Sequence, residues 1–385
     1  MVIYITIYIS LQYLNIGMEM NDKNIVFFVN SLDSGGIENY LLRFLQYKHS
    51  EFNKVYIYCK SGRGGQLESD YLEISNVNII KRKHSYFDLS SYMLMYQFIK
   101  RNNISIICDF TGNFAGFPIA VAALSRVRTR AVFYRSAMDA YQQSYLKKLY
   151  SKLVKDLTFN CSTTILSNSE AAFDYFYKID WRNNEKFKVI LNGLNSDAFM
   201  KTTESLRAEL NISNEAFVVG HTGRYNPAKN HQTILKVAFR LVKKYPNIYF
   251  LLCGNGVKES LNDLVLSEKL NKNILLFENR KDIPIFLNTL DCYFFPSTRE
   301  GQPNALIEAM VMGLPFVASD IPPIRETVGD SHTLYPAMDV DALAVAIEKE
   351  YFDRKGRNIG LQQEMIKRFN YKERFDEFYQ VLLND

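Results

Sequence analysis

The chain of 385 residues has few of the residues that mark small cross-linked or metal-bound modules. It has five cysteines, and they lie at positions 59, 108, 161, 253 and 292, mostly inside apolar segments. Their spacing matches no zinc site, which argues against a metal-stabilised fold. An odd number of cysteines without a pairing logic favours reduced, buried thiols in a cytoplasm.

Glycine-rich fingerprints, repeats and low-complexity linkers are also missing. Gly35-Gly36 lacks the third glycine of the dinucleotide-binding Gly-x-Gly-x-x-Gly pattern, and Gly254-Asn-Gly256 fails the same test. No stretch resembles a nucleic-acid recognition module, so we expect no nucleic-acid partner.

Long apolar runs are absent beyond the first 17 residues, which carry no charge at all. This segment lacks the positive start and the cleavage site of a signal peptide, and it is marginal in length for a spanning helix. We interpret residues 1–20 as an apolar extension from a misassigned start, with translation beginning at Met18 or Met20; a hydrophobic anchor is the alternative. We expect a cytoplasmic protein, or one peripheral on the inner face of the plasma membrane.

What the chain does have is a regular alternation of apolar strands and helices. This alternation predicts an α/β protein with parallel sheets covered by helices. The expected strands are 24–29, 54–58, 104–108, 130–134, 163–167, 187–191, 216–220, 248–252, 273–277, 291–295 and 315–319.

The length suggests two domains, and polar and Gly-rich residues interrupt the pattern at residues 191–197. We therefore predict an N-terminal domain over 21–192 and a C-terminal domain over 193–370. Residues 371–385 are expected to contain a last helix, roughly 371–383.

The stretch from Phe295 to Glu308 is the most informative. It joins an apolar strand to a helix predicted over 303–312, with Pro303 as its first residue and Gly313 as its stop. The backbone amides and the positive end of the helix suit a phosphate. Carboxylates cannot bind phosphate, but they accept hydrogen bonds from sugar hydroxyls. Glu300 and Glu308, on either side of the helix start, therefore predict a nucleotide-sugar site, although two glutamates eight apart also occur by chance on helix surfaces.

A basic loop follows the strand at 216–220. Arg224 and Lys229 could place two positive charges against a diphosphate at the carboxyl end of that strand. A basic loop that binds nothing is the simpler alternative. His231 beside it is expected to start a helix rather than to act in catalysis.

A third loop, Ser31–Glu38, follows the first strand. Gly35 and Gly36 allow the backbone to come close to a ligand and permit positive φ, although an ordinary tight turn is the default interpretation.

These motifs together resemble the retaining GT-B glycosyltransferases of family GT4. The resemblance rests on Glu300 with Glu308 followed by Gly313-Leu-Pro, on Gly223-Arg224 with Lys229-Asn230, and on Gly35-Gly36-Ile-Glu38; it runs from about residue 24 to the end. It implies a GT-B fold of two Rossmann-like domains facing across a cleft, with the last helix crossing back to the first domain. It also implies transfer of a sugar from a nucleoside-diphosphate sugar, without metal or cofactor, to a glycan or lipid-linked acceptor in surface or capsular polysaccharide or lipopolysaccharide synthesis.

The resemblance assigns roles to residues. Glu300 would hold the transferred sugar, Glu308 the ribose, and Arg224 and Lys229 the diphosphate. Further donor contacts are expected from the two glycine loops, from the start of the predicted helix and, by position alone, from the loop at 278–281: Gly35, Gly36, Gly223, Arg280, Gly301, Gln302, Pro303, Asn304, Ala305 and Leu306. Glu38 is a candidate acceptor or sugar contact.

One departure concerns the strand at 130–134. Many relatives carry a histidine after it, whereas this chain has Arg135. Arg135 is a candidate acceptor, sugar or phosphate contact, or a structural residue.

The charge is uneven, with a net +7 over residues 1–195 and −2 over residues 196–385. A basic amphipathic helix around 145–155, with Leu146, Leu149, Tyr150 and Leu153 on one face, could lie on an anionic membrane. An ordinary packed helix with solvated lysines is the alternative.

Asp339-Val-Asp341 is similar to a metal-binding motif of another glycosyltransferase fold, but we expect Asp341 to cap a helix. Two other functions stay open: a nucleotide-sugar epimerase of the same fold, and a non-catalytic relative that binds nucleotide sugar.

Overall fold

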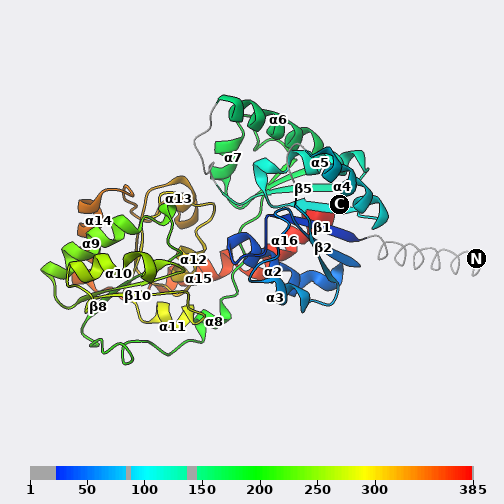
Figure 1. Cartoon of the computed structure of the whole chain (residues 1–385). Coiled ribbons are helices and arrows are strands. Elements are labelled where there is room, and N and C mark those ends of the chain that lie inside the picture. The colour runs from blue at the N-terminus through cyan, green and yellow to red at the C-terminus, as the bar shows by residue number, and fades with distance from the viewer. Residues whose placement is uncertain (1–22, 84–87, 137–144, 384–385) are drawn as a thin grey trace, which may run out of the picture. The chain divides into compact units, whose positions relative to one another are not determined.

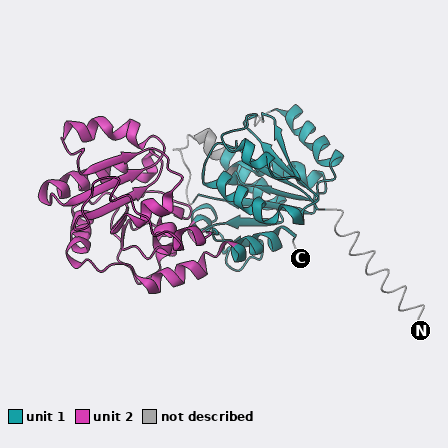
Figure 2. Cartoon of the chain, turned by 90° about the horizontal axis from the view of Figure 1, so that it is seen from below, with its two compact units in different colours: residues 1–168, 172–193, 372–385 teal, residues 169–171, 194–371 magenta. Residues whose placement is uncertain are grey.

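The computed structural model describes residues 23–83, 88–136 and 145–383, without the side chains of 113 and 145–149. The chain divides into two compact units, which are coloured separately in Figure 2. Unit 1 comprises residues 1–168, 172–193 and 372–385, and unit 2 comprises residues 169–171 and 194–371. The uncertain terminal segment 1–22 lies outside the described residues, and with it the predicted extension 1–20.

Unit 1 is built on a seven-stranded sheet with the order β3-β2-β1-β4-β5-β6-β7, in which every pair is parallel. Its central strands are almost wholly apolar and buried, as expected for a parallel sheet covered on both faces. The strands are β1 (Asn24–Val29), β2 (Lys54–Cys59), β3 (Val77–Lys81), β4 (Ile106–Asp109), β5 (Thr129–Tyr134), β6 (Thr164–Ser167) and β7 (Phe187–Val189). The helices are α2 (Gly36–Lys48), α3 (Glu68–Leu72), α4 (Leu89–Arg101), α5 (Gly116–Leu124), α6 (Tyr145–Cys161), α7 (Glu170–Phe176) and α16 (Tyr371–Leu383), as labelled in Figure 1 where there is room.

Unit 2 is built on a five-stranded parallel sheet with the order β10-β9-β8-β11-β12. The strands are β8 (Phe217–Thr222), β9 (Ile248–Cys253), β10 (Ile274–Phe277), β11 (Cys292–Phe295) and β12 (Phe316–Ala318). The helices are α8 (Asp197–Met200), α9 (His231–Lys244), α10 (Val257–Ser267), α11 (Ile283–Asn288), α12 (Asn304–Val311), α13 (Pro322–Val328), α14 (Val340–Asp353) and α15 (Ile359–Arg368).

The predicted fold, an α/β protein with two Rossmann-like sheets, is confirmed. Each of the eleven predicted strands is present, with ends shifted by at most two residues. The strand β3 was missed because it is a short edge strand with a polar pattern, in which Val77 alone is buried. All five cysteines are free thiols.

The last helix, α16, belongs to unit 1 from Lys372 onward. Its phenylalanines enter an aromatic core under β1, β4 and β5. Phe378 packs against Phe44, with ring centroids 4.7 Å apart, and against Phe133 at 5.4 Å. The final turns of the chain therefore complete the core of the unit that the first strand begins.

The packing of α6 does not decide between a membrane-bound and an ordinary packed helix. Val154 and Thr158, one turn apart, face the interior, and Leu153 is exposed. The reason is a close approach to α5, where a Cβ at Gly116 would lie 2.3 Å from the carbonyl oxygen of Val154. Lys155 is not solvated as expected, because its amine donates to the carbonyl of Phe176. The side chains of Leu146 and Leu149 lie outside the described residues.

No helix in the described part of the chain is long and apolar enough to cross a membrane.

Candidate functional site

Two predicted loops of unit 2 meet at one place in the sheet. The strand order reverses between β8 and β11, which makes this the switch point where open α/β sheets bind ligands at their carboxyl ends. The loop with Arg224 and Lys229 follows β8, and the loop with Glu300 follows β11. The fold thus brings together residues that are about seventy positions apart in sequence.

Lys229 and Glu300 form an ion pair across these two loops. The Lys229 Nζ donates to Glu300 Oε1 at 2.6 Å, and the two side chains are only 18% and 10% exposed. The ammonium group also lies over the ring of Phe295, 4.9 Å from its centroid. The pairing was not predicted, and it joins a residue predicted to contact the sugar to one predicted to contact the diphosphate.

Asn230 holds the two loops together. Its side-chain amide donates to the carbonyls of Pro296 (3.0 Å) and Ala337 (2.8 Å), and its backbone adopts a left-handed φ of +56°. The Thr298 amide donates to the Ala228 carbonyl at 2.8 Å. Lys229 and Glu300 therefore stand on backbones that are fixed to each other.

Helix α12 begins beside Glu300. Pro303 is the N-cap rather than the first helical residue, and the helix spans Asn304–Val311, slightly shorter than predicted. Amides in the first turn, such as that of Ala305, have no partner inside the helix because no carbonyl precedes them by four residues. They remain a suitable place for an anionic group.

The end of α12 is as predicted. Gly313 has φ +68°, its amide donates to the Met310 carbonyl, and the Leu314 amide donates to the Ala309 carbonyl. These two bonds form a Schellman motif, which only a residue tolerant of left-handed φ can close cheaply.

Glu308 lies half-buried on α12, one turn beyond the start. Burial raises the pKa of Tyr293 in β11, and the charges of Glu308 and Glu300 raise it further. Both carboxylates thus lie near the same side chain of β11, the strand next to the central β8.

The remaining predicted residues of unit 2 are more peripheral. Arg224 is exposed, and among the described residues it forms no ion pair. Gly223 rests on the loop after β9, where a Cβ at Gly254 would lie 2.1 Å from the Gly223 carbonyl oxygen. Arg280 is held in a bidentate pair with Asp282, at 2.8 and 2.6 Å. Of the other predicted donor contacts at the α12 start, Gln302 and Leu306 are buried, whereas Gly301, Asn304 and Ala305 are half-buried.

The sequence did not indicate that His221 and His231 pack together under this loop. His231 starts α9 as predicted, its ring centroid is 5.1 Å from that of His221, and both are almost fully buried. Burial lowers the pKa of His231 to about 4 and the pKa of His221 well below its usual value. A Cβ at Gly223 would lie 3.0 Å from His221 Nε2, so this neutral pair forms the floor of the Gly223 loop.

Unit 1 places its predicted residues at the carboxyl end of its own sheet, where the order reverses between β1 and β4. Gly35 caps α2 with φ −154°, and neither Gly35 nor Gly36 uses the positive φ that glycine permits. Gly36 faces open space, with nothing within 4 Å of an added Cβ, whereas a Cβ at Gly35 would meet the carboxylate of Glu38. Neither glycine is therefore required by a left-handed turn.

The carboxyl end of the unit 1 sheet carries two further features that the sequence did not reveal. Lys60 and Asp109 form a buried ion pair of 2.6 Å, and Thr111 binds both partners. Arg135, directly after β5, stacks on the ring of Tyr40 in α2 at 4.0 Å from its centroid.

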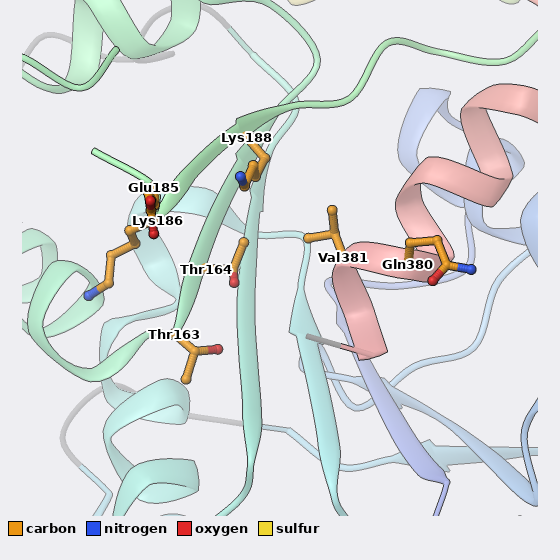
Figure 3. Close-up of a pocket in the computed structure, with 7 residues that line it drawn as sticks. All are labelled: Thr163, Thr164, Glu185, Lys186, Lys188, Gln380 and Val381. Carbon is orange, nitrogen blue, oxygen red and sulfur yellow. The ribbon is translucent and has the colours of Figure 1, made fainter. Parts of the chain in front are cut away.

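A cavity of about 390 Å³ also lies in unit 1 (Figure 3). It is lined by residues from the amino ends of β6 and β7 and from α16: Thr163, Thr164, Glu185, Lys186, Lys188, Gln380 and Val381. The cavity lies at the amino end of the parallel strands, opposite to the carboxyl end at which Arg135 lies, and no predicted site residue lines it.

The Asp-Val-Asp segment is a helix start, as expected, but the capping residue differs. Asp339 accepts the amide of Ala342, and Asp341 in the first turn pairs with Arg240 instead. The reason is register, because α14 begins at Val340, two residues earlier than a cap at Asp341 requires.

Two family models match almost the whole chain. "Glycosyltransferase Family 4" matches residues 34–198, and "Glycosyl transferases group 1" matches residues 202–369.

Individual relatives agree. The chain is 24% identical to the capsular polysaccharide biosynthesis glycosyltransferase CapM of Staphylococcus aureus over 80% of this chain and 82% of that protein. It is also 24% identical to the UDP-Gal:alpha-D-GlcNAc-diphosphoundecaprenol alpha-1,3-galactosyltransferase of Escherichia coli, over 74% and 76%. Among solved structures, Alr3699/HepE of Anabaena in complex with UDP superposes with a TM-score of 0.75 at 19% identity, covering 94% of this chain and 100% of that one.

Proposed function

Because this chain belongs to the GT4-type glycosyltransferases with the GT-B fold, we propose that it uses a nucleoside-diphosphate sugar as donor and retains the configuration of the transferred sugar. The acceptor is a glycan or a lipid-linked glycan in the synthesis of a surface or capsular polysaccharide. Relatives named for capsular synthesis and for a diphosphoundecaprenol acceptor support this class of acceptor.

The observation that carries the proposal is the Lys229–Glu300 pair at the β8/β11 switch point, beside the first turn of α12. Cleavage of the donor puts growing negative charge on the diphosphate. Lys229, Arg224 and the amides of residues 301–305 stabilise that charge, which lowers the barrier. Glu300 orients the sugar hydroxyls, and Glu308 holds the ribose.

The ion pair adds a condition to this mechanism. A diphosphate that reaches Lys229 competes with Glu300 for the ammonium group, since both are anions. Donor binding therefore releases the Glu300 carboxylate for the sugar. The acceptor hydroxyl attacks from the side of the leaving group, and the diphosphate helps to accept its proton, so no separate protein base is required.

Glu300→Gln tests this mechanism because it keeps the shape of the side chain and removes its charge. We expect the turnover of the accepted donor to fall by about 100-fold or more, while the affinity for UDP or the matching nucleotide is equal or up to about tenfold higher, since Lys229 no longer has a competing anion. Binding is measured by calorimetry and thermal shift without added metal, first with UDP, GDP and ADP and then with their sugars.

The matched control is Glu268→Gln, which breaks an exposed pair with Lys243 in the same unit and should change neither quantity. Lys229→Met should weaken nucleoside diphosphate binding much more than nucleoside binding. Full turnover of a sugar by Glu300→Gln, or nucleotide affinity that is insensitive to Lys229→Met, would contradict the proposed site.

A further inference from the structure

The side chain of Arg135 is half-buried and lies in an unusual environment. Its Nη1 atom is inaccessible to solvent and has no hydrogen-bond partner among the described residues. The group lies 4.0 Å from the centroid of the Tyr40 ring and 4.9 Å from that of Phe133, so aromatic faces, and not acceptors, surround it on that side.

This arrangement costs stability. A cation above an aromatic ring gains on the order of 1–2 kcal/mol, whereas a buried donor without an acceptor, such as Nη1, costs about 1–3 kcal/mol. Burial accordingly lowers the pKa of Arg135 to about 10, which still leaves it charged at neutral pH. A side chain selected for packing alone would be served better by an apolar residue of the same length.

The position of Arg135 suits its positive charge to ligand binding. It is the first residue after β5, at the carboxyl edge of the unit 1 sheet, where open α/β sheets receive ligands. Tyr40, on which it stacks, is one turn along α2 from Gly36, so both face the same side of that helix. Gly36 leaves open space there. The planar fork is thus fixed by stacking beside an accessible surface, which is the preorganisation that carboxylate and phosphate recognition requires.

We propose that Arg135 binds an acidic group, a carboxylate or a phosphate, of the acceptor molecule. This inference rests on the proposed function in that it assigns the acceptor to unit 1. The two acidic groups have different sources: a carboxylate indicates a uronic or other acidic sugar in the glycan, and a phosphate indicates the phosphate of a lipid carrier. The guanidinium would donate to either group in a bidentate contact.

Two matched pairs of amphiphiles test the proposal on the full chain. Octyl glucuronide against octyl glucoside isolates a carboxylate, and farnesyl phosphate against farnesol isolates a phosphate. Each Kd is measured by calorimetry below the micelle concentration, with wild type, with Arg135→Met and with Arg101→Met. Arg101 is an exposed arginine at the end of α4, so its replacement removes the same charge from unit 1 at another place.

We expect the acidic member of one pair to bind at least tenfold more tightly than its neutral partner. Arg135→Met should abolish that preference, and Arg101→Met should retain it. Because Nη1 is buried without an acceptor, Arg135→Met should also leave the melting temperature unchanged or raise it. Arg135→Lys, which keeps the charge but loses the fork, should recover the preference only partly.

The proposal is overturned if neither acidic member is preferred by wild type, or if the preference survives in Arg135→Met. A marked fall in the melting temperature of Arg135→Met with no change in preference would assign Arg135 a structural role. Nucleotide binding to unit 2, measured in the same samples, tests the proposed function separately. Loss of UDP, GDP and ADP binding with an intact acidic preference would refute the donor site and leave the Arg135 site in place.

Discussion

His221 and His231 show how a pair of buried side chains supports a ligand loop without touching a ligand. They lie below Gly223, and burial keeps both neutral by lowering their pKa values. In the unfolded chain both would titrate near pH 6.5, so acid favours the unfolded state. The contribution of His231 to stability is complete above that pH and is lost as the pH falls from 6.5 to about 4, and the contribution of His221 is lost in the same direction.

This linkage can be measured with His231→Gln, which cannot be protonated. Wild type should lose about 1–3 kcal/mol more unfolding free energy than the variant between pH 7 and pH 4.5, since carboxylate titration is common to both. Urea unfolding at several pH values measures the difference. Parallel curves for the two proteins would show that His231 contributes nothing to the pH dependence.

The sequence predicted some of these residues and missed others for a physical reason. The start of α9 at His231 follows from local patterning, but its contact with His221 depends on how the loop after β8 folds under Gly223. Likewise, Lys229 and Glu300 were each predicted from their motifs, whereas their ion pair depends on the neighbouring positions of β8 and β11 in the sheet. Local signals identify residues, and tertiary packing decides their partners.

At the scale of elements, both ends of α12 are well defined, and the glycine after its carboxyl end contacts the start of α15. The carbonyl of Gly313 accepts the amide of Asn358, whose side chain in turn caps α15. A Cβ at Gly313 would lie 2.9 Å from the Asn358 carbonyl oxygen. The stop of α12 and the start of α15 therefore depend on the same glycine.

Gly313→Ala should lower the unfolding free energy by about 2–3 kcal/mol, because a left-handed Ala costs about 1–2 kcal/mol and the contact with Asn358 adds to it. Gly256→Ala is the matched control. Gly256 also has a left-handed backbone, but its Cβ would meet only Tyr225 at an ordinary 3.6 Å. Denaturant unfolding of the two variants separates the backbone cost from the contact, and equal losses would show that the contact with Asn358 costs nothing.

The inner strands of the two sheets were easier to predict from the sequence than the edge strand β3. Central strands such as β1 and β11 are continuous apolar runs, which only burial in a parallel sheet explains. The strand β3 escapes that rule because edge strands are half solvated. Similarly, the sequence did not indicate that Val154 is the residue of α6 that packs inward at Gly116.

At the scale of the whole molecule, unit 1 is discontinuous in sequence. Its aromatic core includes Phe375 and Phe378 from α16, packed on Tyr40, Phe44 and Phe133. Phe378→Ala should destabilise unit 1 by about 3–5 kcal/mol through loss of buried surface and the cavity left behind.

Hydrogen exchange can locate this loss. Peptides of unit 1 should lose protection in Phe378→Ala, while peptides of unit 2 should change little, because the affected core belongs to unit 1. Phe352→Ala, which removes an exposed ring from α14 in unit 2, is the control and should leave both patterns unchanged. An equal loss in both units after Phe378→Ala would mean that they unfold as one cooperative body.

The place of α16 also has a consequence for synthesis. A ribosome delivers the chain from the amino end, so β1 emerges first and α16 last. Unit 2 consists of residues 194–371 together with the short segment 169–171. Its sheet can therefore form while the aromatic core of unit 1 still lacks the side chains of α16. Unit 1, whose strands are synthesised first, therefore completes its fold last. A chain that ends before α16 exposes the apolar core of unit 1, which chaperones and proteases recognise.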